Sequence, residues 1–117
     1  MPQERFQEPF YDETADETLA AIKTDSGYLF FVQLSNIDSA GYFLQLFDAA
    51  VGDVTLGTTT PTLSLPVPPG DATDEGASIH EFDPPIRFKT AITYAVTTTA
   101  GGSTGPTTAL TMNAGVR

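Results

Sequence analysis

The sequence predicts an all-β protein: a two-sheet antiparallel β-sandwich with an extended N-terminal arm. From Thr18 onward the chain is a series of short runs rich in β-branched and aromatic residues, separated by turn residues. No run has the apolar spacing of an amphipathic helix. Such a series of short strands fits either an immunoglobulin-like or a jelly-roll-like sandwich, and both topologies stay open at this point.

The predicted strands follow from period-two alternation and from the turn residues between them. We expect them at residues 18–24, 28–37, 41–48, 61–67, 77–82, 86–89, 91–98 and 107–113. The turns at 25–27 and 36–41 are short, so the first three strands are predicted to form an antiparallel meander. Four prolines in or beside the fourth strand cannot donate ladder hydrogen bonds, which predicts a sheet edge there. The Gly/Thr-rich stretch at 97–108 suits a long hairpin loop.

The first 17 residues differ from the rest of the chain. Residues 1–17 contain Pro2, Pro9 and an acidic excess with no sustained period, which predicts an extended arm, whereas residues 18–117 form the sandwich domain. The arm also carries three aromatic side chains, Phe6, Phe10 and Tyr11. They indicate that the arm docks on something. A disordered tail, or an arm folded against its own domain, is the alternative.

Composition excludes several classes of partner. The chain has 117 residues, which is the size of one domain, and it has no cysteine that would form a disulfide or a thiolate metal site. Its formal net charge of −10 opposes binding to phosphate backbones and to anionic lipids, so we expect neither nucleic acid nor membrane as a partner. The charged start lacks the apolar run of a secretory signal, so we expect synthesis in a cytoplasm.

The stretch AGYFLQLFDAA, residues 40–50, has apolar side chains at both parities. A strand with one wet face alternates apolar and polar residues instead. We assign Phe30, Val32, Leu34, Tyr42, Leu44 and Leu46 to the core face, and Leu29, Phe31, Phe43 and Phe47 to the opposite face. Left open to water, that opposite face would be an apolar patch of the kind that marks interaction sites. The arm, a neighbouring loop or another subunit must cover it.

No constellation for catalysis emerges. Ser78 and His80 would share a strand face, but no third residue is evident to orient the imidazole, and there is no G-x-S-x-G motif. The loop with Asp71, Asp74 and Glu75 offers oxygen ligands for calcium without the spacing of a known calcium loop, so a solvated acidic turn is the favoured interpretation. We therefore expect a protein that is not an enzyme and has no cofactor.

The stretches GYLFFVQLSN, AGYFLQLFDAA, GTTTPTLSLPVPPG and FDPPIRFKTAITYAVTTT resemble a family of small structural proteins of tailed bacteriophages. The resemblance covers residues 19 to 113. Its positions are Gly27, Leu29, Tyr42, Phe43, Asp48, Gly57, Thr58, Pro61, Val67, Pro68, Gly70, Pro85, Phe88, Thr97 and Thr98. These are turn and core residues, so they point to a scaffold rather than to a site.

The resemblance implies a virion component, a capsid decoration or cement protein on the outside of the phage head. Its partner would be the major capsid protein, and it would sit on the head as a homo-oligomer, a dimer or a trimer. The expected contact residues are Phe6, Phe10, Tyr11, Phe31, Phe43 and Phe47. The alternative is a tail or fibre module that binds host carbohydrate through exposed aromatics and the loop at 99–108. An esterase or glycosidase built on His80 or on the acidic loop is the least favoured hypothesis.

Overall fold

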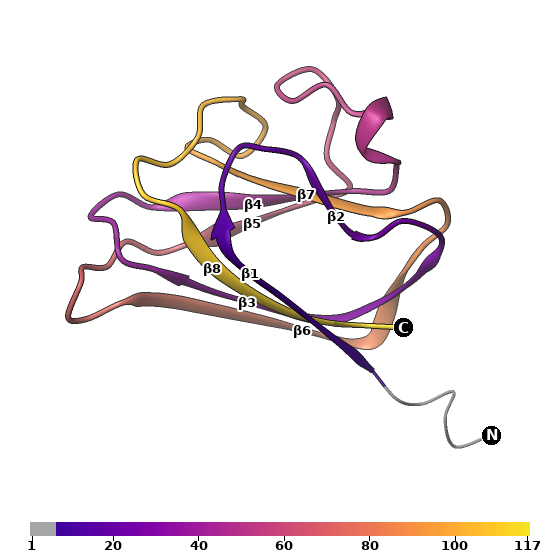
Figure 1. The fold of residues 1–117 in the computed structure, drawn as a ribbon, viewed down its shortest axis with the longest axis horizontal. Coiled ribbons are helices and arrows are strands. Elements are labelled where there is room, and N and C mark those ends of the chain that lie inside the picture. Colours follow the sequence, from indigo (N-terminus) through magenta and orange to yellow (C-terminus); the bar gives the residue numbers. More distant parts are fainter. Residues whose placement is uncertain (1–6) are drawn as a thin grey trace.

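The computed structural model describes residues 7–117, so the expected contact residue Phe6 lies outside the described residues. Eight strands form two four-stranded sheets that pack face to face (Figure 1). The strands are β1 Glu8–Ala15, β2 Ala20–Lys23, β3 Gly27–Asn36, β4 Tyr42–Phe47, β5 Leu63–Val67, β6 Gly76–Phe88, β7 Ile92–Thr97 and β8 Leu110–Val116. A single turn of 3-10 helix, Val51–Asp53, lies between β4 and β5.

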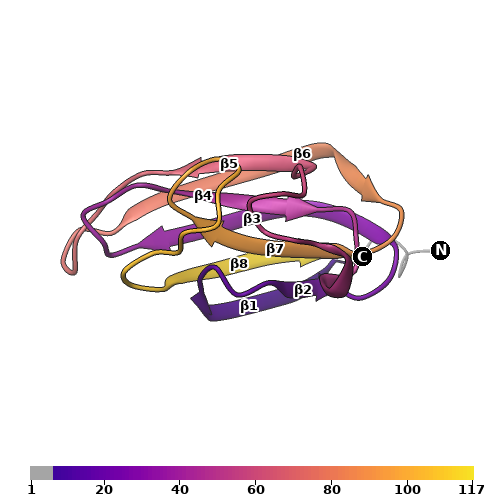
Figure 2. The ribbon, with the colours of Figure 1, turned by 90° about the horizontal axis from the view of Figure 1, so that it is seen from above.

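The strand order decides between the two topologies. Sheet A has the order β1-β8-β3-β6 and sheet B the order β2-β7-β4-β5, and every pairing is antiparallel. This is the order of a jelly roll, in which eight strands form two Greek keys, and it is not the order of an immunoglobulin sandwich. In the view from above, β1 and β2 run along one long side of the sandwich and β5 and β6 along the other (Figure 2). The predicted all-β sandwich is confirmed.

The predicted meander is wrong. The chain passes from sheet B in β2 to sheet A in β3 and back to sheet B in β4, so these three strands do not pair with one another. Strand β3 instead pairs with β8 and β6, which lie far along the sequence. Short turns with glycine reverse the chain direction, but they do so equally well between two sheets as within one, and the alternation pattern does not distinguish the two cases.

The segment expected to be an extended arm forms β1. Glu8 lies opposite Val116 and Asp12 opposite Met112, with a bulge before Ala15. Because β1 is an edge strand, Pro9 costs no hydrogen bond on its open side, and Glu8 and Glu13 stay in water. Residues 8–15 are therefore an integral strand of sheet A, in contrast to the prediction.

The core lies between the two sheets and includes most of the residues assigned to it. Val32, Leu34, Tyr42, Leu44 and Leu46 are all buried, as predicted. Leu29 was assigned to the opposite face and is fully buried instead. The cause is a bulge in β3 between Leu29 and Phe31, which adds one residue and lets Leu29 and Val32 both point inward. Phe30, the extra residue, is only half-buried.

Three further predictions concern the edges and connections. The proline-rich strand β5 is an edge strand of sheet B, which confirms its predicted position. The two strands expected at 77–82 and 86–89 are one strand, β6, whose register with β3 breaks between Glu81 and Ile86. The stretch at 97–108 is not a hairpin loop, because it leads from β7 in sheet B to β8 in sheet A.

Candidate interaction surface

The outer face of sheet B is covered by loops of the same chain. Phe43, Gln45 and Phe47 point away from the core, yet Gln45 is 0% and Phe47 only 1% exposed. The segments 48–62 and 98–109 lie on the outer side of this sheet (Figure 1). A neighbouring loop was one of three predicted covers for the apolar residues of AGYFLQLFDAA, and loops cover most of this face. Phe43 remains half-buried.

Hydrogen bonds fix the Gly/Thr-rich loop on this face. The Gln45 side-chain amide donates to the Thr97 hydroxyl at 2.6 Å and to the Gly102 carbonyl at 3.0 Å. The Ser64 hydroxyl donates to the Ala100 carbonyl at 2.7 Å. The loop thus accepts hydrogen bonds from the Gln45 amide and the Ser64 hydroxyl, whereas the buried Gln45 Oε1 has no hydrogen-bond partner within residues 7–117. The stretch proposed as a carbohydrate contact is thus used, at least in part, within the fold.

The second covering loop is attached by its ends. The Thr93 hydroxyl donates a hydrogen bond to the Ala49 backbone carbonyl at 2.6 Å. The Val54 side chain of the same loop is buried. Asp48 accepts hydrogen bonds from the backbone N–H of Lys89 at 3.0 Å and of Thr90 at 2.8 Å. Burial alone would raise the pKa of Asp48, but these backbone donors outweigh it and lower that pKa.

Phe10 also faces the interior. It packs against the core with its ring 5.7 Å from that of Tyr94 at 78°, an edge-to-face arrangement. The Tyr94 hydroxyl donates to the Asp12 carboxylate, which lies on the same side of β1 as Phe10. The domain's own packing buries the Phe47 ring and partly buries the Phe10 ring. Their contact with a partner stays a prediction.

The outer face of sheet A is different. Antiparallel pairing places Tyr11, Asn113, Gln33 and Ile79 in one row across the four strands. Tyr11 is 60% and Ile79 62% exposed, the two most exposed large apolar side chains among residues 7–117. Between them the Asn113 side-chain amide donates a hydrogen bond to the Gln33 side-chain oxygen Oε1 at 3.0 Å. We call this row with its neighbour Phe31 the sheet A face.

Phe31 completes the sheet A face in the adjacent row. It lies opposite Gly115 on β8 and Glu81 on β6. A Cβ atom on Gly115 would come within 2.6 Å of the Phe31 ring, so glycine at this position lets the ring lie across β8. Phe31 is half-buried as a result and widens the apolar part of the face. Of the expected contact residues within 7–117, Tyr11 and Phe31 lie on this face.

The residues weighed for chemistry do not assemble into a reaction centre. Ser78 and His80 share a face of β6, as predicted, and it is the face toward the core, where both are half-buried. The Ser78 hydroxyl and the His80 Nε2 have no hydrogen-bond partner within residues 7–117. The Asp71 carboxylate accepts hydrogen bonds from the Thr73 hydroxyl and from the Thr73 and Asp74 N–H groups, and these bonds lower its pKa.

Comparisons with known proteins add no relative. Protein-family models, curated proteins and solved structures all give no match to this chain. In the part of the chain described, no group of three or more His, Cys, Asp or Glu side chains is placed to hold a metal ion. No helix within residues 7–117 is long and apolar enough to cross a membrane.

Proposed function

We propose that this protein is a non-enzymatic virion structural protein that decorates the outside of a phage head. In this proposal it binds major capsid subunits through the sheet A face and stabilises the contacts between them. The phage head as the particle and the major capsid protein as the partner are taken from the sequence resemblance. The observation that carries the contact surface is the exposure of Tyr11 and Ile79 on a sheet whose outer side no loop of residues 7–117 covers.

The contrast between the two sheets supports this choice of surface. Loops bury the outer face of sheet B, where Gln45 and Phe47 are almost inaccessible. The sheet A face instead pairs exposed apolar groups with an amide ladder, the mixture of apolar anchors and hydrogen-bonding groups that protein interfaces use. It is an open sheet surface, so it suits the surface of another protein better than it suits a small ligand, which binds in concave pockets.

Binding of variants to purified capsids tests the proposal. The Tyr11→Ser, Ile79→Ser double variant removes both exposed anchors, and Val51→Ser is the matched control, since Val51 is 38% exposed on the loop over sheet B. We expect the wild type to saturate the heads and the double variant to lose affinity by about tenfold or more, with the control unchanged. Thermal unfolding verifies that all three are folded. Wild-type occupancy by the double variant, or no binding by the wild type, would overturn the proposal.

A second candidate function is a tail or fibre module that binds host carbohydrate. The ladder from Asn113 to Gln33 and on to Ser35 places amide and hydroxyl groups beside the exposed ring of Tyr11, and sugars are recognised by such groups. Glycan-array binding that is lost in Tyr11→Ser, without binding to heads, would favour this alternative. Copy numbers in the hundreds per particle would favour decoration.

A further inference from the structure

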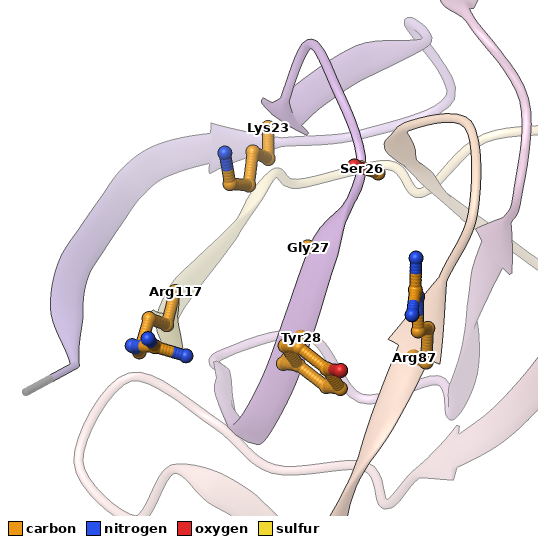
Figure 3. Close-up of a pocket in the computed structure, with 6 residues that line it drawn as sticks. All are labelled: Lys23, Ser26, Gly27, Tyr28, Arg87 and Arg117. Carbon is orange, nitrogen blue, oxygen red and sulfur yellow. The ribbon is translucent and has the colours of Figure 1, made fainter. Parts of the chain in front are cut away.

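A pocket of about 320 Å³ opens at one end of the sandwich, where β2, β3, β6 and β8 meet. Its lining contains three basic side chains, Lys23, Arg87 and Arg117, although the whole protein has only five basic residues and a net charge of −10. Figure 3 shows Lys23 and Arg117 on one side of β3 and Arg87 on the other, with the Tyr28 ring between them. We call this site the basic pocket.

Local packing holds these side chains in place. Arg117 and Tyr28 exchange two backbone hydrogen bonds, at 2.9 and 3.0 Å. The Arg87 guanidinium lies 5.7 Å from the centre of the Tyr28 ring, a cation–π contact. The Lys23 stem lies against Gly27, since a Cβ atom there would come within 2.6 Å of it. Asp25 pairs with Lys23 at 2.6 Å, so this lysine is partly neutralised.

Arginine is suited to binding carboxylates. Its planar guanidinium forms two parallel hydrogen bonds with a carboxylate and is less strongly hydrated than a lysine ammonium. No ion pair to Arg87 or Arg117 exists within residues 7–117. Glu8 is the acidic neighbour from β1, since it pairs with Val116. The arginines therefore keep donors for an external acidic group.

The opposite end of the molecule carries such groups. The loop between β5 and β6 holds Asp71, Asp74 and Glu75, and it lies at the far end of the long axis from the basic pocket (Figure 1). The four basic residues within 7–117 are all near the pocket end, because Lys89 directly follows Phe88, the partner of Gly27. The basic side chains within residues 7–117 therefore lie at one end of a molecule 44 Å long, and the acidic loop lies at the other end.

The acidic loop is built to present two carboxylates. Asp71 is occupied inside the turn, where it accepts the Thr73 and Asp74 N–H groups at 2.9 and 2.7 Å. The Gly70 N–H donates to the Asp38 carbonyl at 2.8 Å, which anchors the loop to the end of β3. Asp74 and Glu75 are exposed in this loop. A fixed loop loses less conformational entropy when it binds than a flexible one does.

We propose that the basic pocket receives the acidic loop of a second copy of this protein, so that copies associate head to tail. Asp74 and Glu75 of one copy would pair with Arg87 and Arg117 of the next. The two surfaces differ, so the contact is heterologous and generates a ring or an open chain rather than a two-fold dimer. This inference is independent of the capsid proposal, because it concerns only contacts between copies.

Two charge-reversed variants of the full chain test it by sedimentation velocity. We expect the wild type to associate in a concentration-dependent way at low salt, and less so at high salt, where exposed charges are screened. Arg87→Glu with Arg117→Glu should abolish association, as should Asp74→Lys with Glu75→Lys. Mixing the two variants should restore it, since each supplies the complement of the other. Val51→Ser, outside the pocket lining and the acidic loop, is the control and should associate like the wild type.

Three outcomes would overturn the proposal. The first is a wild type that stays monomeric at low salt, and the second is association that neither charge reversal weakens. The third is a pocket that binds only small anions. The NMR signals of Tyr28 and Arg87 would then shift on titration with inorganic phosphate while the protein remains monomeric. Melting temperatures close to the wild type establish that loss of association does not reflect unfolding. Capsid binding is measured separately, so that failure of either proposal leaves the other testable.

Discussion

The Tyr94 hydroxyl donates a hydrogen bond to the Asp12 carboxylate and so joins a central strand of sheet B to an edge strand of sheet A. Burial and this contact raise the pKa of Tyr94. Burial opposes ionisation of Asp12, but the hydrogen bonds from Tyr94 and Thr14 outweigh it and lower the pKa of Asp12. The pair is therefore held as a neutral phenol and an ionised carboxylate, in the layer where Phe10 packs.

Removing the phenol oxygen should loosen β1. We expect Tyr94→Phe to lower the free energy of unfolding by about 1–3 kcal/mol, because the half-buried Asp12 carboxylate loses a donor while the ring packing remains. Urea denaturation measures the loss. Tyr28→Phe is the control, since Tyr28 lies at the surface against Arg87, and it should change stability by less than about 0.5 kcal/mol. Equal effects of the two variants would contradict the assigned role of Asp12.

Acid should destabilise the fold through its paired carboxylates. Asp12 and Asp48 have lowered pKa values in the folded state, whereas an aspartate in the unfolded chain titrates near pH ~3.9. As the pH falls, the unfolded state binds more protons than the folded state does. The contribution of these two carboxylates to the free energy of unfolding is therefore fully present above about pH 5 and is lost progressively below about pH 4. Unfolding free energies measured from pH 7 to pH 3 check the sign.

Asp48→Asn isolates one contributor to this pH dependence. The neutral amide has a single acceptor oxygen in place of the two that bind the Lys89 and Thr90 N–H groups. We expect a loss of about 1 kcal/mol at pH 7 and a smaller loss of stability on acidification than in the wild type. An unchanged pH profile would show that Asp48 does not contribute.

The sequence predicted the parts of this fold that depend on local pattern. Alternation located β2 to β8, with β6 predicted as two strands, and the prolines placed β5 at an edge. It did not predict which sheet each strand joins, because β3 finds its partners β6 and β8 through pairings far along the chain. The bulge beside Phe30 reverses the parity that placed Leu29 outside. Register shifts of one residue leave no mark in composition.

The candidate surface was predicted only in part for a related reason. Apolar residues at both parities of AGYFLQLFDAA correctly required a cover, but the sequence did not reveal that two loops of the same chain supply most of it. Gln45 was the available signal, since a lone amide among apolar residues needs a buried partner, and it finds the Gly102 carbonyl. Ile79, now part of the sheet A face, gave no signal, because an isoleucine at a strand position predicts core.

The different positions of two phenylalanines give a direct test of that cover. Phe47 is 1% exposed beneath the 48–62 loop, whereas Phe31 is half-buried on the sheet A face. We expect Phe47→Ala to cost about 3–5 kcal/mol of stability, the range for a buried phenylalanine. Phe31→Ala should cost less, because part of its ring is already in water, and should weaken capsid binding instead. Stability losses of equal size would argue that Phe31 is a core residue.

Glycine at the base of the acidic loop permits a close approach of two backbone segments. A Cβ atom on Gly76 would lie 2.4 Å from the carbonyl oxygens of both Pro68 and Pro69, and backbone atoms cannot rotate away as a side chain would. We expect Gly76→Ala to destabilise the fold by about 1–3 kcal/mol, the usual cost of overpacking. Gly52→Ala is the matched control, since a Cβ atom there meets nothing within 4 Å. Chemical denaturation of both variants makes the comparison. If Gly76→Ala is as stable as Gly52→Ala, the backbone at Pro68 and Pro69 shifts at little cost. The acidic loop would then be less rigid than head-to-tail association requires.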